Sequence, residues 1–240
     1  MPSGDGIGKT APTAQLSLED LVRGAEKTFD NAESLFYEAE LLAKAGAVAR
    51  ALCLHQISLE ECSKVGNLGA WAVSLILGFD VDQEKVLAAF RRHAAKNRTN
   101  AYMLEGSQAE KDAKARGDFD AARAAFRQTQ EAFHETSNTA KNAALYVDWV
   151  DGAFAAPDER ITTEMLEEVT KRNAEFLGYA HNSLKTLQRL QMSGDALRPR
   201  LVRLLEDMEK LRDAKPEDVL RTMNDLLARF IEEGKQALKE

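Results

Sequence analysis

Apolar residues recur at helical spacing along most of the chain. From Leu18 they return every three or four positions, which predicts a first helix that begins after Ser17 and ends near Gly46. Ser17 suits an N-cap because its hydroxyl oxygen can accept a hydrogen bond from the first turn. A second helix is predicted to begin near Ala47. The apolar run 68–79 either continues this helix or begins another buried one.

The same spacing predicts further helices along the rest of the chain. Their expected ranges are 83–105, 118–150, 163–192, 200–213 and 216–238. The helix over 118–150 is expected to end in LYVDWVDG. Residues 106–117 are charged and weakly patterned, so they form either a loop or an exposed helical turn. Glycine and proline at 152–161 and 193–199 predict a loop and a turn there.

This pattern predicts an all-α protein with three regions. Residues 1–16 are rich in Gly, Pro, Ser and Thr and are expected to be a disordered tail. Residues 17–192 are expected to form an up-and-down helical bundle, and 193–240 a C-terminal helical extension. The composition agrees with helices, because alanine and leucine dominate and aromatic residues make up only 7%.

Charge and cysteine content narrow the classes of function. The net charge is −7, so contact with nucleic acid needs a local basic patch. Cys53 and Cys62 share one predicted helix about 13 Å apart, at a rise of about 1.5 Å per residue, which is too far for a disulfide. Buried thiols suit a reducing cytosol. No apolar run is long enough for a transmembrane helix, so we expect a cytoplasmic protein without membrane contact.

Two short motifs have simple explanations. GDGIGKT, at residues 4–10, lacks the first glycine and the flanking strand of a phosphate-binding loop, so a flexible tail is expected. Glu131 and His134 form a single Glu-x-x-His pair. A di-iron bundle needs two such pairs and two further carboxylates, so we expect no metal and no other cofactor.

Two arginine–histidine pairs match the spacing Arg-x4–6-His of helical ribonucleases in the HEPN superfamily. They are Arg50 with His55 and Arg127 with His134. About one such match is expected by chance in a chain of this composition, so the motif is weak evidence. His55 also lies on the apolar stripe of its helix, which favours a packed core histidine.

A polar cluster interrupts the second helix at Glu60, Glu61 and Lys64. Glu60 and Lys64 have the spacing and order of a favourable helical ion pair, worth about 0.2–0.5 kcal/mol. Glu61 lies on an apolar stripe with Leu54 and Val65, and a carboxylate there must find a partner or take up a proton. A buried structural network and a functional cleft both fit this pattern.

The segment RRHAAKNR, at residues 91–98, is a dense basic cluster around a histidine. It places four fixed positive charges within two helical turns of His93. It is either a solvated basic face or a surface that contacts phosphate. The arginines disfavour the charged form of His93, so this histidine can accept a proton near neutral pH.

Together these segments resemble the AbiV abortive-infection family, within the HEPN superfamily of helical proteins. The resemblance is carried by residues 31–64 (NAESLFYEAELLAKAGAVARALCLHQISLEECSK), by His93 and Lys96, and by residues 145–168 with Tyr146, Asp148 and the preceding Lys141. It covers about residues 30–180. It implies an HEPN-like helical bundle, a role in bacterial antiphage defence and a homodimer.

The resemblance leaves two alternatives for activity. In the first, the chain is a metal-independent ribonuclease acting on RNA or translation. His93 would then be the general acid or base, Lys96 with Arg92 or Lys64 would stabilise charge on the phosphate, and Glu61 would orient these side chains. In the second, the cleft binds a phage protein or RNA without catalysis. The binding residues expected in either case are Arg50, Glu60, Arg92, Lys141 and Tyr146.

Overall fold

The computed structural model describes residues 15–90, 104–209, 222–223, 225–226, 228–230 and 232–233, without the side chains of 194 and 195. Its elements are α1 (Leu18–Lys44), α2 (Val48–Leu77), α3 (Gln83–Phe90), α5 (Gln108–Ala115), α6 (Phe119–Ala143), β1 (Asp148–Val150), β2 (Ala153–Ala155), α7 (Pro157–Arg160) and α8 (Thr163–Glu209). The described residues between 222 and 233 are also helical. The predicted all-α class is confirmed, with one short hairpin. Most of the predicted tail, residues 1–14, lies outside the described residues.

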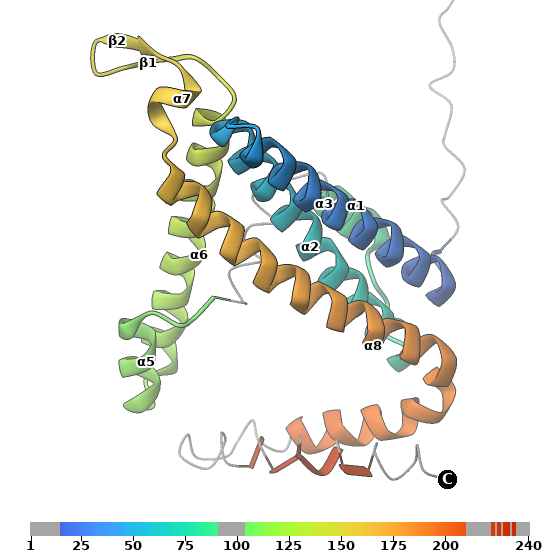
Figure 1. Cartoon of the computed structure of the whole chain (residues 1–240). Helices are drawn as coiled ribbons and strands as arrows, with labels where there is room; N and C mark the ends of the chain where they lie inside the picture. The colour runs from blue at the N-terminus through green and yellow to red at the C-terminus, as the bar shows by residue number, and fades with distance from the viewer. Residues whose placement is uncertain are drawn as a thin grey trace, which may run out of the picture.

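The long helices α1, α2 and α8 lie side by side and form the centre of the bundle (Figure 1). The first two are antiparallel and meet at Gly46, whose φ of +80° is a left-handed conformation that glycine adopts easily. Leu21 from α1, Leu52 and Leu59 from α2, and Leu187 from α8 are each almost wholly buried. The core therefore lies where these three helices meet.

Local signals explain the ends of the first two helices. The Ser17 hydroxyl accepts a hydrogen bond from the Asp20 amide, and the Asp20 carboxylate accepts one from the Ser17 amide, each at 3.1 Å. This reciprocal pair is a capping box and begins α1 where the sequence predicted. The apolar run 68–79 continues α2 as far as Leu77, and Gly78 ends it with φ +79°.

The helices between α2 and the hairpin, α3, α5 and α6, build the outer part of the bundle. The prediction of a helix over 83–105 is confirmed for 83–90, and residues 91–103 lie outside the described residues. The weakly patterned segment 106–117 forms α5, capped by Ser107. Figure 1 shows α5 packed along α6 at one side of the bundle. No helix in the described part of the chain is long and apolar enough to cross a membrane.

The predicted end of the fourth helix is wrong, because LYVDWVDG leaves the helix and begins a β-hairpin. The helix α6 ends at Ala143, and β1 pairs antiparallel with β2. The two-residue turn between them is Asp151-Gly152, with φ of +51° and +85°. Positive φ at both positions is what a type I′ turn requires, and Asp-Gly is one of its preferred sequences. The expected loop 152–161 therefore contains β2 and the short helix α7.

The predicted turn at 193–199 and the separate helix after it are also wrong. The helix α8 runs without a break from Thr163 to Glu209 and contains Pro199. Figure 1 shows that α8 changes direction sharply in its C-terminal part and then runs back beneath the bundle. A proline inside a helix removes one backbone hydrogen bond and bends the helix without having to end it.

Candidate functional site

A buried ion pair joins α2 to α6 at the predicted polar cluster. Lys141 Nζ donates to Glu60 Oε1 at 2.8 Å, and only 10% and 3% of the two side chains are exposed. Lys141 was predicted to belong to the site on the resemblance, and the structure brings it to Glu60. An ion pair of this kind must satisfy both charges internally, because almost no water reaches them.

Of the alternatives for this cluster, the helical ion pair between Glu60 and Lys64 does not form. Lys64 Nζ instead contacts Glu61 Oε1 at 2.5 Å, one turn along the same helix. The Glu61 and Lys64 side chains are 12% and 21% exposed. The carboxylate on the apolar stripe has therefore found its partner in the nearest lysine, while Glu60 points to α6. The cluster is two ion pairs on neighbouring faces of α2.

The two cysteines of α2 are buried and not activated. Burial raises the pKa of the Cys53 thiol, with Lys141 acting in the opposite direction. Burial also raises the pKa of Cys62, to about 12. Because the thiolate is the reactive form, neither side chain is suited to nucleophilic chemistry near neutral pH.

His55 is a packed core histidine, as its place on an apolar stripe predicted. It is fully buried, and its ring meets the Phe36 ring edge to face at 4.9 Å. The Asn173 amide nitrogen lies 3.1 Å from Nδ1, while Ser58 donates toward the Asn173 oxygen at 3.1 Å and the Ala32 carbonyl at 2.8 Å. Since the amide donates, Nδ1 accepts and the ring proton is on Nε2.

The environment of His55 keeps the ring neutral. Its Nε2 lies 3.5 Å from Glu40 Oε1, which is too long for a strong hydrogen bond. Burial lowers the pKa of His55, and the Glu40 carboxylate opposes this only in part. Arg50 lies on the same helix and is exposed, whereas His55 is buried in the core. These two residues therefore present no shared surface on which a nuclease pair could act.

The other predicted site residues fall into two groups. Arg92, His93 and Lys96 lie outside the described residues, so their roles stay predictions. The last described residue before them, Phe90, lines a cavity of about 410 Å³ between α3 and α2 together with Asn67. Tyr146 is exposed, in the segment that joins α6 to the hairpin. The structure thus groups Glu60 with Lys141 and leaves Tyr146 on the outer surface.

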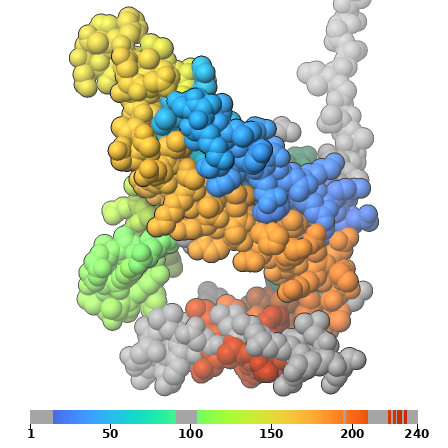
Figure 2. All heavy atoms as spheres, viewed as in Figure 1, coloured from blue at the N-terminus to red at the C-terminus, as the bar shows by residue number. Residues whose placement is uncertain are grey.

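Sequence reasoning missed the hairpin that follows α6. Trp149 and Phe154 are cross-strand partners, and their rings meet edge to face with centroids 4.9 Å apart. Both remain largely exposed. Figure 2 shows the hairpin, in yellow, projecting beyond the end of the bundle. The Asp-Gly turn flanked by Val, Trp and Phe was the local signal that could have revealed it.

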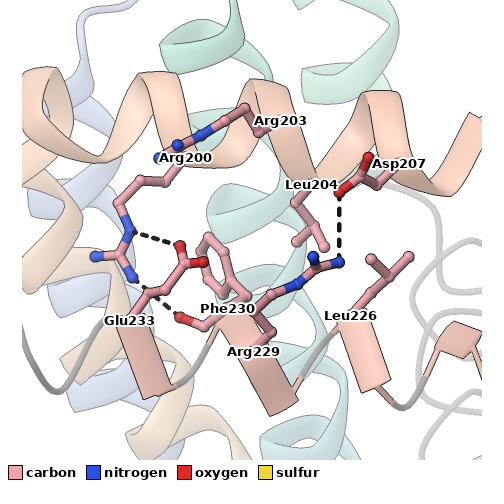
Figure 3. Close-up of a pocket in the computed structure, with 8 residues that line it drawn as sticks. All are labelled: Arg200, Arg203, Leu204, Asp207, Leu226, Arg229, Phe230 and Glu233. Atoms are coloured by element: carbon pink, nitrogen blue, oxygen red, sulfur yellow. Dashed lines mark hydrogen bonds and ion pairs between the residues drawn. The ribbon is translucent and has the colours of Figure 1, made fainter.

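A polar cavity lies between α8 and the helical residues after 222. Its volume is about 150 Å³, and three arginines and two acids line it (Figure 3). Arg200 lies 3.9 Å from Glu233 and donates to the Phe230 carbonyl at 3.0 Å, and Arg229 lies 3.5 Å from Asp207. These contacts pair Arg200 and Arg229 with acids and link α8 to the helical residues after 222.

Comparison with known proteins places the chain in a family. The family model HEPN_AbiV, described as AbiV, matches residues 20–178. The chain is similar to the uncharacterized protein y4gJ of Sinorhizobium fredii (strain NBRC 101917 / NGR234), with 62% identity over 111 residues. This alignment covers 46% of the chain and 58% of that relative, so the chain spans less than two thirds of the relative's length. No solved structure matches. The family model covers more than half of the chain, and the helical structure agrees with it. The chain therefore belongs to the AbiV family of HEPN abortive-infection proteins.

Proposed function

We propose that this chain serves in abortive infection as an interaction module that binds a phage protein or RNA without cleaving it. The observation that supports this is that the described charged side chains of the predicted cleft already form ion pairs with one another. Its described acids and lysines are engaged with each other: Glu60 with Lys141, and Glu61 with Lys64. A general acid or base must reach a substrate proton, and a buried ion pair is poorly placed for that.

The buried pair has a clear role in a binding module. Lys141 stands four residues before Leu145, where the exposed segment leading to the hairpin begins. By holding α6 against α2, the Glu60–Lys141 pair holds the base of that segment on the bundle. Preorganised surfaces lose less conformational entropy on binding, so such a clamp supports recognition.

The test is an RNA-cleavage assay in EDTA at high protein concentration, paired with a phage-resistance assay in cells. The proposal expects intact RNA with the wild-type chain, and resistance that persists in His93→Ala. Recovery of a specific partner from infected cells would support it further. RNA cleavage that His93→Ala abolishes, with its circular dichroism spectrum unchanged, would refute the proposal.

The second candidate is a metal-independent ribonuclease. Membership in an HEPN family favours it, and so does the partial exposure of Glu61 and Lys64, which exceeds that of the deeper pair. His93 would act as general acid or base and Lys96 would stabilise the phosphate. Lys64→Met should then lower cleavage, while Lys111→Met, at an exposed pair on α5, should not. A homodimer stays a prediction of the family resemblance, and light scattering would test it.

A further inference from the structure

Exposed large hydrophobic side chains are concentrated in one short stretch of the chain. Of the twelve in the described part of the chain, five fall within residues 145–154. They are Leu145, Tyr146, Val147, Trp149 and Phe154. Single exposed hydrophobic residues are normal, but a cluster with three aromatic rings is typical of a site that contacts another molecule.

The hairpin presents two of these rings in a defined arrangement. Trp149 is 60% exposed and Phe154 73% exposed, although the two rings pack on each other. Their mutual contact helps to hold the strands together, by about 0.5–1.5 kcal/mol for an aromatic pair. It leaves more than half of the surface of each residue exposed to solvent. Packing within the hairpin therefore buries only part of the surface of these two aromatic residues.

The base of the hairpin is anchored to the bundle. On the strand side, Arg160 of α7 lies 3.8 Å from the Asp148 carboxylate. On the bundle side, α7 packs against α2. The type I′ turn sets the twist of the two strands. The rings thus project from an ordered support, as Figure 2 shows for the whole hairpin.

The charges around the rings define the partner. Residues 145–160 carry four carboxylates and one guanidinium. The carboxylates belong to Asp148, Asp151, Asp158 and Glu159, and all four residues are exposed. Aromatic faces attract arginine and lysine side chains, and nearby carboxylates strengthen that attraction. The same carboxylates repel phosphate, which disfavours stacking of RNA bases on these rings.

We propose that the β1–β2 hairpin is a docking site for a cationic segment of a partner protein. Arginine or lysine side chains of the partner lie against Trp149 and Phe154, and Asp151 complements their charge. This inference rests on the proposed binding function and names the chemistry of its partner. Nothing in it requires the residues predicted for catalysis.

The test selects random twelve-residue peptides on the full wild-type chain, with counter-selection on Trp149→Ala/Phe154→Ala. An enriched peptide is then titrated against Trp71→Phe, in which Trp149 is the remaining tryptophan. We expect arginine- or lysine-rich peptides and a change in Trp149 emission. Trp149→Ala should weaken binding about tenfold or more. Asp151→Asn, which retains the turn because asparagine tolerates positive φ, should weaken it about threefold, with less effect at high salt.

Matched controls keep each outcome decisive. Glu175→Gln removes an exposed charge from α8 and should leave binding unchanged. Enrichment of acidic or neutral peptides, or equal affinity for Trp149→Ala, overturns the proposal. Tighter binding of a single-stranded RNA to the hairpin also overturns it. So does a dimer in light scattering that Trp149→Ala/Phe154→Ala dissolves, because a second copy then covers the rings. RNA cleavage by the wild-type chain would instead refute the proposed function, whatever the peptides show.

Discussion

Removal of Lys141 tests whether its buried pair with Glu60 stabilises the contact between α2 and α6. Lys141→Met keeps an unbranched apolar chain but removes the ammonium group. Glu60, with a side chain only 3% exposed, then loses this partner. Breaking a buried ion pair on one side costs about 3–5 kcal/mol, because the remaining charge stays buried. We expect the free energy of unfolding to fall by about that amount, a large part of the stability of an ordinary domain.

Urea unfolding followed by far-UV circular dichroism at pH 7.5 measures this loss. Because Glu60 and Lys141 each have further contacts, a double-mutant cycle with Glu60→Gln isolates the pair itself. Residues in direct contact typically couple by about 0.5–3 kcal/mol, and burial places this pair in the upper half of that range. The matched control is Lys111→Met on α5, where the lysine and its partner Glu105 are both exposed. Its effect should stay below about 1 kcal/mol.

Two results would refute the reasoning. One is a coupling energy below about 0.5 kcal/mol, which is the level expected of independent sites. The other is a loss in Lys141→Met no larger than in Lys111→Met. Either would mean that water or another contact compensates the Glu60 carboxylate, so that the pair with Lys141 is not what stabilises this contact between α2 and α6.

Three further predictions follow from the same structure. Burial raises the pKa of Cys62 to about 12 and also raises that of Cys53. Both thiols should therefore resist iodoacetamide at pH 8 until urea unfolds the chain. Fast labelling of the native protein, detected by mass spectrometry, would contradict this. Burial lowers the pKa of His55 below its ordinary 6.5, so the unfolded chain binds that proton more readily. Stability present above about pH 6.5 should therefore fall as the pH drops. His55→Gln should reduce the difference between the urea midpoints at pH 7.5 and 5.5, and an undiminished difference would contradict this. Gly152→Ala places a side chain at φ +85°, at a cost of about 1–2 kcal/mol. The substitution should weaken the near-UV circular dichroism of the hairpin while the far-UV signal of the helices stays constant. An unchanged near-UV spectrum would argue against the turn.

Several local features could be predicted from the sequence because neighbouring residues determine them. The cap at Ser17 and the bend at Gly46 depend on side chains and backbone freedom within one turn. The hairpin belongs in this class too. Its Asp-Gly turn was present in the sequence, and the apolar residues before it were mistaken for the end of a helix. At Pro199 the sequence predicted the end of a helix, but a proline can bend a helix that continues on both sides.

The partners of the polar groups in α2 were decided only by the tertiary structure. Helical spacing placed Glu61 and His55 on apolar stripes, so each needed a partner, and it offered Lys64 as a partner for Glu60. It could not show that Glu60 meets Lys141, 81 residues away, or that His55 meets Asn173, 118 residues away. The physical reason is that periodicity determines which face of a helix is buried, whereas packing decides which helix covers that face. The sequence by itself therefore determined the family and the long helices, and the packing of α6 and α8 on α2 decided which side chains share a site.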